Sequence, residues 1–417
     1  MEGSAGSKPS YSTLLKNRSF TYLWVGQFIS QSGDAVFDIA LLWLVLTTTG
    51  STALVGLTQA AILIPAVLVS PFAGVYADRA NRRNTMVVSN LVQGIVTATV
   101  SVLYVANSLD FSMLILLVLL LYAAAQFYRA AAGAIVPRLV SRESLGAANG
   151  LLSLSASTNQ LVGYSLGGIV IIALGPVAPV TYDSLTFFIA AALMVFIAKS
   201  YGQPRLESTP PTTERRSFWK DFREGLAYVR RSRFFLQLVF FGLLVNFFAT
   251  ALFTLLAPYA KTWVHGDAST YGFLAAAFAL GTILGSAAIG KVNFRAHVGR
   301  LVFFGVAAFG VLFIFIGLAT SIPIALMLFL AMGVILAIVN VPINSLVQTK
   351  VPGEMLGRAG TVLASTLAAA QPVAAVLSGD LAVVTSIGTV IVACGVAVVV
   401  TSLALYPFFK ELRTASY

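Results

Sequence analysis

The sequence predicts an all-α membrane protein whose twelve transmembrane helices form two pseudo-symmetric six-helix bundles. Three observations support this fold class: an apolar composition, twelve long apolar runs, and positive charges confined to alternate loops. Of the 417 residues, 58% are hydrophobic and 10% are charged, and the mean hydropathy is +0.90. Because an ordinary soluble chain is about 25% charged, this chain lacks the polar side chains to cover a surface that faces water.

The apolar runs are long enough to cross a hydrocarbon core of about 30 Å as helices. A transmembrane barrel would instead need alternating segments of about ten residues. We therefore expect helical spans at residues 19–48, 52–77, 85–106, 111–136, 145–173, 178–198, 234–258, 269–290, 299–319, 322–347, 358–383 and 386–408.

The loops between these runs differ in charge. If the N-terminal segment is cytoplasmic, Lys261 is the only one of the 26 Lys and Arg that is assigned to the opposite side. One missed or extra span would reverse every later loop, so the asymmetry supports a multi-pass protein of the plasma membrane with both termini in the cytoplasm. The net charge of +11 then reflects cations beside anionic lipid, and we expect no nucleic-acid partner.

A basic, Pro-containing linker divides the chain into two halves. Within it, Phe218, Phe222, Leu226 and Val229 recur at helical spacing and predict a basic amphipathic helix on the cytoplasmic surface. Docking of a partner is the alternative role for this helix. The predicted parts are an N-terminal bundle, a cytoplasmic linker and a C-terminal bundle, at residues 1–198, 199–233 and 234–417.

The two halves resemble each other. Glu143-Ser144-Leu145-Gly146 matches Glu354-Met355-Leu356-Gly357, and Gly168 falls on Gly379 at the same offset. Two parallel six-helix repeats around a site at mid-membrane are typical of alternating-access transporters.

A charged motif joins the second and third spans. Its glycine is expected to permit close helix packing, and its acid and arginines lie where they can pair or face a helix N-terminus. A plain positively charged loop is the alternative. The motif residues are Gly74, Asp78, Arg79, Arg82 and Arg83.

This motif resembles the loop signature G-x-x-x-D-R-x-x-R-R of the major facilitator superfamily, except at Tyr76 and Asn81. The resemblance implies a conformational latch, in which Asp78 bridges to the start of the eleventh span near Gly357 and Arg358. The bridge would break as the two halves rock.

Other segments are similar to the macrolide-efflux and enterobactin-exporter branch of the superfamily. They are the opening of the first span from Leu23 to Asp34, Ala148-Asn149-Gly150, and Val351-Pro352-Gly353-Glu354. This resemblance implies a monomeric drug:proton antiporter that exports drugs or siderophore-like compounds.

The fifth span contains Gly163-Tyr164-Ser165-Leu166-Gly167-Gly168. It is similar to the antiporter motif G-P-x-x-G-G, with Tyr164 in place of proline. Helix packing through Gly163 and Gly167 is the alternative interpretation.

Two acids lie near the middle of the first span. Asp34 and Asp38 are four residues apart and therefore share one helix face. Since a charged side chain at mid-membrane costs about 2.5–3.5 kcal/mol on insertion scales, we expect both to face a cavity or an internal partner. Arg129 in the fourth span is placed to reach Asp34, and its release on protonation of Asp34 would act as a coupling switch. A static bridge that fixes helix packing is the alternative.

Further polar residues lie inside the spans. Asp183 and Asp380 fall toward outer helix ends, where we interpret them as interfacial or capping acids with gating as the alternative. Uncharged polar residues can line a substrate cavity or only join helices; the candidates for the cavity are Gln31, Gln126, Asn246, Asn340 and Asn344. Few fixed charges in an apolar cavity favour amphipathic or hydrophobic substrates.

The sequence contains no pattern that indicates an enzyme, a metal site or a cofactor. Cys394 is the only cysteine, and His265 and His297 fall in loops on opposite faces. Secondary active, proton-coupled export by alternating access is therefore the first hypothesis. A lipid or lipid-linked translocase on the same fold is the alternative, but it would need phosphate-binding cations in the cavity, where only Arg129 is found.

Overall fold

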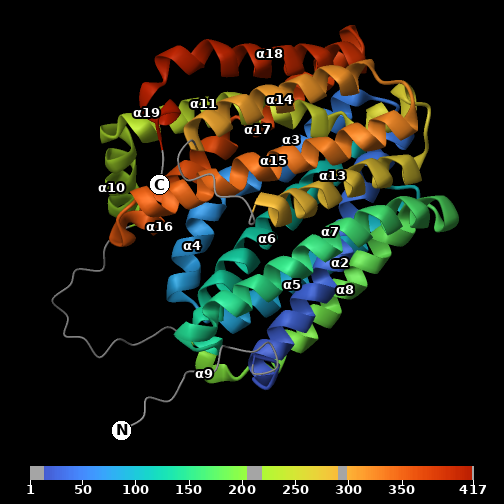
Figure 1. Cartoon of the computed structure of the whole chain (residues 1–417). Helices are drawn as coiled ribbons and strands as arrows, with labels where there is room; N and C mark the ends of the chain where they lie inside the picture. The colour runs from blue at the N-terminus through green and yellow to red at the C-terminus, as the bar shows by residue number, and fades with distance from the viewer. Residues whose placement is uncertain (1–13, 204–217, 290–297, 416–417) are drawn as a thin grey trace. The chain divides into compact units, whose positions relative to one another are not determined.

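The computed structural model describes residues 14–203, 218–289 and 298–415 (Figure 1). These residues are largely helical and include no strand, so the all-α prediction is confirmed. Among them, eleven helices are long and apolar enough to cross a membrane, and a bent helix pair makes a twelfth span when it is counted as one. The count agrees with the twelve spans predicted from the sequence.

The bent pair replaces the continuous helix predicted at 52–77. Helix α3 (Thr52–Leu68) and helix α4 (Ser70–Arg79) meet at an angle of 45°. Pro71 opens α4, and a proline ring has no N–H to donate to the preceding turn. Pro372 similarly opens α17 (Gln371–Val384), which is separated from α16 (Gly353–Ala369) inside the predicted span 358–383.

Residue contacts divide the chain into two compact units. Unit 1 comprises residues 1–41 and 68–208, and unit 2 comprises residues 42–67 and 209–417. The end of the first long helix and α3 as far as residue 67 therefore pack with the second unit. The domain boundaries expected from the sequence stay a prediction.

Unit 1 is built around the first long helix, α2 (Arg18–Thr49), as far as residue 41. A buried apolar cluster that includes Phe20, Met86 and Met194 joins its helices near one end. Asn81 begins α5 by accepting a hydrogen bond from the Asn84 amide at 3.1 Å. The other elements of unit 1 are α4, α5 (Arg82–Val105), α6 (Phe111–Leu139), η1 (Arg142–Ser144), α7 (Leu145–Leu174), α8 (Val177–Val195) and α9 (Lys199–Gly202).

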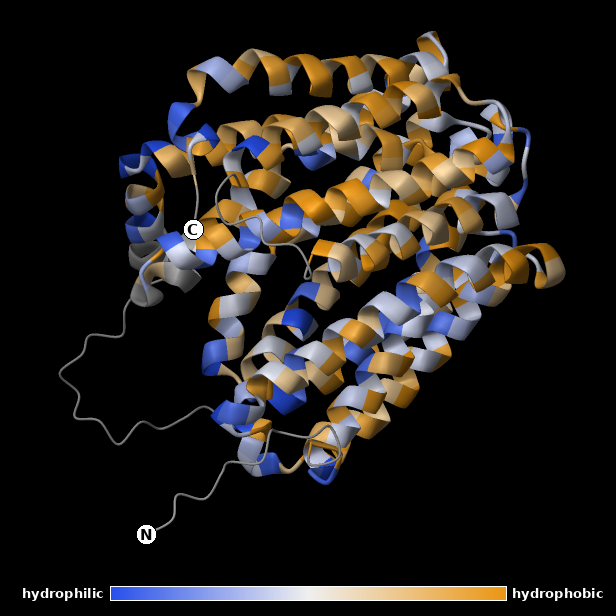
Figure 2. Cartoon of the chain, viewed as in Figure 1, coloured by the Kyte–Doolittle hydropathy of each residue, from blue (hydrophilic) through white to orange (hydrophobic). Residues whose placement is uncertain are grey.

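Unit 2 contains α3, except for its last residue, and every element from α10 onward. Close glycine contacts pair α13 with α15 and α14 with α18, at Gly281 with Gly333 and at Gly310 with Gly395. Apolar colour covers most of α14, α15 and α18 (Figure 2). The elements are α10 (Phe218–Arg231), α11 (Arg233–Thr254), α12 (Leu256–Pro258), η2 (Tyr259–Trp263), α13 (Ala268–Ile289), α14 (Val298–Leu318), α15 (Ile322–Lys350), α16, α17, α18 (Ile387–Phe408) and α19 (Lys410–Arg413).

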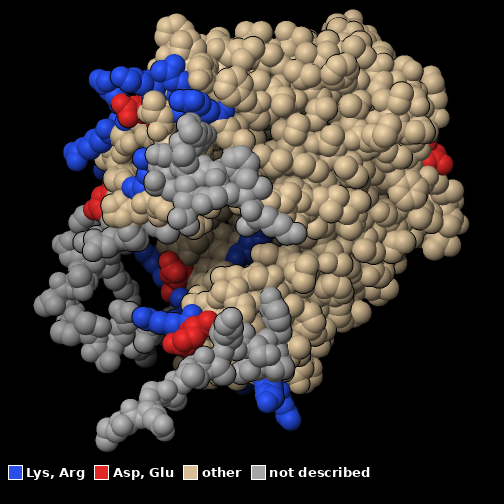
Figure 3. Space-filling model, viewed as in Figure 1, with Lys and Arg blue, Asp and Glu red and all other residues tan. Residues whose placement is uncertain are grey.

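Helix α10 is the helix predicted in the linker. The side chains of residues 218–222, which include Phe218 and Phe222, lie outside the described part of the chain. Val229 is buried in the core of unit 2 and Leu226 packs against that core, whereas Arg230 and Arg231 are exposed. Lys and Arg side chains gather around α10 and α19 within this unit (Figure 3). The helix therefore buries its apolar face at least partly against its own protein.

Candidate functional site

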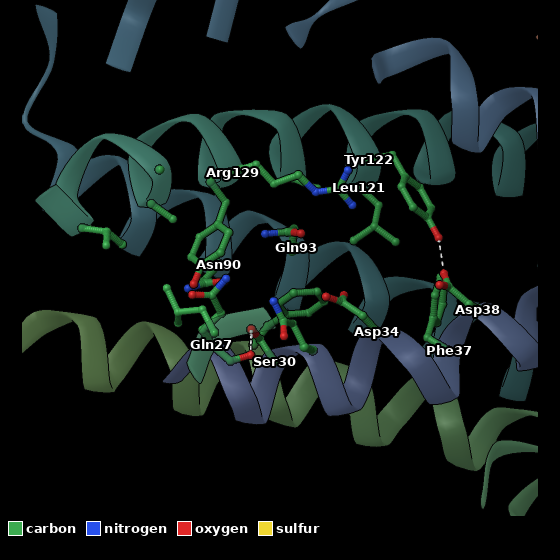
Figure 4. A pocket seen from close by; sticks show the side chains of 18 of the residues that line it. Gln27, Ser30, Asp34, Phe37, Asp38, Asn90, Gln93, Leu121, Tyr122 and Arg129 are labelled. Atoms are coloured by element: carbon green, nitrogen blue, oxygen red, sulfur yellow. Dashed lines mark hydrogen bonds between the residues drawn. The ribbon is translucent and has the colours of Figure 1, made fainter. Parts of the chain in front are cut away.

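A cavity of about 440 Å³ lies inside unit 1, among α2, α5, α6, α7 and α8. Four residues predicted from the sequence line it: Gln31, Asp34, Asp38 and Arg129. Figure 4 shows the acids on α2 and Arg129 on the facing helix α6. Both acids therefore lie on one face of α2 toward a cavity, as their spacing in the sequence predicts. Their roles in transport stay predictions.

Asp38 has a direct partner on the opposite wall of the cavity. The Tyr122 hydroxyl of α6 donates a hydrogen bond of 2.6 Å to Asp38 Oδ1, drawn as a dashed line in Figure 4. Hydrogen bonds to an ionised carboxylate are short and strong. The contact connects α2 to α6 at the position of the acid.

Arg129 shares the cavity with the acids but is not bonded to them. Its side chain is exposed and lines the cavity. Within the described residues, the structure contains no ion pair between Arg129 and either Asp34 or Asp38. The static bridge is therefore not seen in this structure, and the release of Arg129 as a coupling switch stays a prediction.

Several buried polar groups in this cavity lack hydrogen-bond partners among the described residues. They are both side-chain polar atoms of Asn90, the Tyr128 hydroxyl and Gln31 Oε1, and all three residues line the cavity. An unsatisfied buried group costs about 1–3 kcal/mol. The cavity thus presents donors and acceptors that a ligand or water can satisfy.

Several polar residues of this cavity were not predicted from the sequence, among them Tyr122 of α6 and two residues of α5. Asn90 and Gln93 of α5 are 1% and 4% exposed and both line the wall. They lie three residues apart in an apolar span, so the helical-spacing argument applied to Asn340 and Asn344 would have found them. Tyr128 of α6 also lines this cavity.

Gln126 does not have the position expected of it. It is 6% exposed and is not among the residues that line the cavity. Its side-chain amide donates to the Tyr122 carbonyl at 3.2 Å, one turn earlier in the same helix.

A second cavity of about 350 Å³ lies inside unit 2, among α11, α14, α15 and α16. Asn246, Asn340 and Asn344 all line it, within walls that are otherwise apolar. The Asn246 amide donates to the Gly242 carbonyl at 2.8 Å, and its oxygen accepts from Gln371 at 3.3 Å. Asn340 and Asn344 are the exposed amides on one face of α15.

The charged motif forms the junction of α4 and α5. Asp78 and Arg79 are exposed, and Asp78 interacts electrostatically with Arg82, which is 8% exposed. Arg83 donates to the Val195 carbonyl at the end of α8. These contacts attach the junction to its own unit. Arg358 lies in α16, but its side chain is outside the described residues, so the latch stays a prediction.

Gly74 does not pack closely against another helix, contrary to the expectation from the sequence. A Cβ added there would meet no atom within 4 Å. The position is half-buried in α4, whose packed side carries Ala73 and Ala77 instead. Close packing is therefore not the role of this glycine in the described conformation.

The glycines of the fifth predicted span contact α2 next to the acids. A Cβ on Gly163 would come within 2.5 Å of Ala35 Cβ, and one on Gly167 would come within 3.3 Å of Val36 Cα. Gly168 is buried in the same helix, α7. This geometry favours helix packing, and an antiporter-specific role stays a prediction.

Asp183 corrects an interpretation from the sequence. It is not interfacial: its side chain is 0% exposed, deep between helices of unit 1. The sequence position near a helix end gave no sign of this burial, which comes from the close approach of α8 to α2 at Gly33. Asp380, by contrast, is exposed.

Comparisons with known proteins identify the family. The family model described as transmembrane secretion effector matches residues 10–415. Macrolide efflux protein A of Streptococcus pyogenes is 22% identical over 365 residues, with 86% of this chain and 88% of that protein covered. Multidrug efflux pump Tap of Mycobacterium tuberculosis is 24% identical over 397 residues, with 93% of each covered.

A solved structure shares the fold. The nucleoside transporter NupG superposes with a TM-score of 0.71 at 12% identity and covers 94% of this chain and 99% of its own. At this identity the likeness concerns the fold alone. The chain belongs to the transmembrane secretion effector family of the major facilitator superfamily, a family of multi-pass membrane transporters of small molecules and not of enzymes.

Proposed function

We propose that this transporter exports amphipathic or hydrophobic small molecules across the plasma membrane in exchange for protons, by alternating access. The observation that carries the proposal is the pair of acids, Asp34 and Asp38, on one wall of a cavity inside unit 1. A carboxyl that faces a cavity can exchange a proton with water or a substrate, whereas one that faces lipid cannot. Intramembrane acids of transporters commonly belong to such proton relays.

The substrate class follows from the walls of the two cavities. The unit 1 cavity offers unpaired hydrogen-bonding groups at Asn90, Gln31 and Tyr128 beside the acids. The unit 2 cavity is mainly apolar with amides at Asn340 and Asn344. Each cavity by itself combines hydrogen-bonding groups with apolar walls, which suits an amphipathic molecule. Relatives named for macrolide and multidrug efflux support the direction and the kind of substrate.

The test is transport by purified protein in liposomes with an imposed pH gradient, using a panel of dyes and antibiotics. We expect Asp34→Asn to abolish pH-driven transport while the protein remains folded, because asparagine keeps the shape of the side chain but cannot carry a proton. The matched control is Asp380→Asn, which alters an exposed aspartate. Wild-type rates in the Asp34 variant would reject this residue as the coupling acid.

A second measurement separates export of drugs from lipid translocation. Labelled phospholipid is included in the same liposomes, and its movement between leaflets is followed. We expect no acceleration, because Arg129 is the only cation that lines the unit 1 cavity and none lines that of unit 2 among the described residues. Rapid lipid movement without dye transport would favour a lipid translocase instead.

A further inference from the structure

Asp183 is a buried acid that the proposed transport mechanism does not yet use. Its side chain is 0% exposed, and neither carboxyl oxygen has a hydrogen-bond partner within the described part of the chain. The nearby Thr186 hydroxyl donates to the backbone carbonyl of Asp183 itself at 2.7 Å. Among the described residues, the Thr186 side chain is the one group whose interaction favours a negative charge on this carboxyl, and its single proton is used by the backbone carbonyl.

Close helix packing holds this carboxyl against the segment that carries Asp34. A Cβ on Gly33 of α2 would come within 2.5 Å of Asp183 Oδ1 and 3.0 Å of Asp183 Cα. Only a glycine leaves that space, and Gly33 immediately precedes Asp34 in the chain. Asp34 lines the cavity, whereas Asp183 is not among the residues that line it.

Among the residues that the structure describes, the titratable side chains that interact electrostatically with Asp183 are acidic or phenolic. They are Asp34 and Asp38 on α2 and Tyr122 on α6. Helix α5, which also packs on α8, contributes the uncharged Gly94 carbonyl, which accepts from the Ser184 hydroxyl at 2.9 Å. Within the described residues, no cation is placed to neutralise an ionised Asp183.

These surroundings determine which form of the side chain fits. A buried ion without a partner is strongly unfavourable, whereas a neutral carboxylic acid carries its own proton. Asp38 differs, since the Tyr122 hydroxyl supplies it with a donor. Asp183, Asp34 and Asp38 interact electrostatically, so ionisation of one of these carboxyls opposes ionisation of the others. The binding of a proton at one of them is therefore coupled to binding at the others.

We propose that Asp183 is a second proton-binding site of the transporter, and that it exchanges its proton with the cavity through Asp34. In the exchange, the O–H bond of the Asp183 acid breaks and one forms on the Asp34 carboxylate, so the charge of the pair is unchanged. The proton exchange with Asp34 during transport rests on the proposed proton-coupled function. The binding of a proton by Asp183 is independent of that function.

Infrared spectroscopy of the full-length protein in lipid tests the binding site directly. A protonated carboxyl gives a C=O band that an ionised one lacks. We expect Asp183→Asn to remove one acid's share of this band at neutral pH, and Asp380→Asn to leave it unchanged. Equal bands in the two variants would overturn the proposal. If the Asp183 variant does not fold, wild-type protein with ¹³C-labelled aspartate carboxyls replaces it, and absence of any protonated aspartate at neutral pH overturns the proposal equally.

Transport in liposomes tests the coupling to Asp34. Coupled acids titrate in separate macroscopic steps, so we expect Asp183→Asn to lose one step from the pH profile of transport, while Asp183→Glu retains it. A profile that coincides with that of the wild type would overturn the coupling. If wild-type transport does not respond to the pH gradient, the proposed function fails, and the infrared result still decides whether Asp183 binds a proton.

Discussion

One hydrogen bond distinguishes the two acids of α2. Asp38 accepts from the Tyr122 hydroxyl at 2.6 Å, whereas no described side chain donates to Asp34. The same helix, α6, carries a second tyrosine, Tyr128, whose buried hydroxyl has no partner among the described residues. The two tyrosines therefore form a matched pair. Replacement by phenylalanine removes a hydrogen-bonded hydroxyl at Tyr122 and an unpaired hydroxyl at Tyr128.

Replacing these tyrosines should have opposite effects on stability. We expect Tyr122→Phe to lower the free energy of unfolding by about 1.5–3 kcal/mol if the acceptor is ionised, because it removes a hydrogen bond to a charged group. Tyr128→Phe should leave stability unchanged or raise it slightly, since it removes an unpaired hydroxyl. Chemical denaturation in detergent measures both. Equal losses in the two variants would contradict the assignment of the Tyr122 bond.

Asp267 provides a pH-dependent prediction outside the membrane spans. The Ser269 hydroxyl at 2.6 Å and the Thr270 amide at 3.0 Å hold the pKa of the Asp267 carboxyl below its ordinary value. A depressed folded-state pKa means that the stabilisation is complete above the ordinary aspartate value and is lost as the pH falls through the folded-state value. We expect Asp267→Ala to cost about 1 kcal/mol at neutral pH, less where solvent screens the exposed site.

The control for this prediction is Asp267→Asn, which keeps an acceptor at the start of α13 but cannot titrate. Thermal unfolding over a series of pH values should show the difference between wild type and Asp267→Ala shrinking toward acid. The asparagine variant should lack that pH dependence. A difference that stays constant into acid would show that the carboxylate does not cap the helix.

At the scale of elements, glycines determine how closely helices approach. Gly56 of α3 and Gly379 of α17 bring two backbones together, and the Thr52 hydroxyl donates to the Gly379 carbonyl at 3.2 Å. The spans themselves could be predicted, because length and hydropathy are local properties of the sequence. Which glycines meet could not, since the contact joins segments far apart along the chain, as the separation of 327 between Thr52 and Gly379 shows.

The crossing of α3 and α17 should be sensitive to a single methyl group. A Cβ on Gly56 would come within 2.5 Å of the Ala375 carbonyl oxygen and 3.1 Å of Gly379 Cα. We expect Gly56→Ala to destabilise the protein by about 1–3 kcal/mol through overpacking. The same change at Gly146, where a Cβ would meet nothing within 4 Å, should be neutral or stabilising by up to about 1 kcal/mol. Thermal unfolding in detergent measures the difference in stability between the two variants. Equal stabilities would show that α3 and α17 are not closely packed at Gly56.

At the scale of the whole molecule, charge and composition were sufficient to predict the class of protein. Alternate basic loops gave the number of spans, and intramembrane charge led to Asp34, Asp38 and Arg129. The burial of Asp183 and the exclusion of Gln126 from the cavity depend on how helices pack. A single sequence does not contain that information, because a residue near a helix end has the same local pattern whether it faces water or a neighbouring helix.

The orientation in the membrane is open to a labelling test. In a Cys394→Ser background, which lacks the only cysteine, we expect Ser108→Cys to react with a membrane-impermeant thiol reagent in intact cells. Ser141→Cys should react only after the membrane is opened, because its loop follows the fourth span and carries positive charge. Both positions are exposed. Labelling of both in intact cells would contradict the cytoplasmic assignment of the termini.

The contact between α3 and α17 also bears on how the protein can be divided. Residues 42–67 precede the linker in the chain, yet they supply one side of the glycine crossing in the unit formed by the later helices. A gene fragment that starts at the linker would leave Gly379 and the Thr52-bonded carbonyl without their covering helix. If the two halves are expressed separately, α3 from the first half must therefore pack against α17 of the second half before unit 2 is complete.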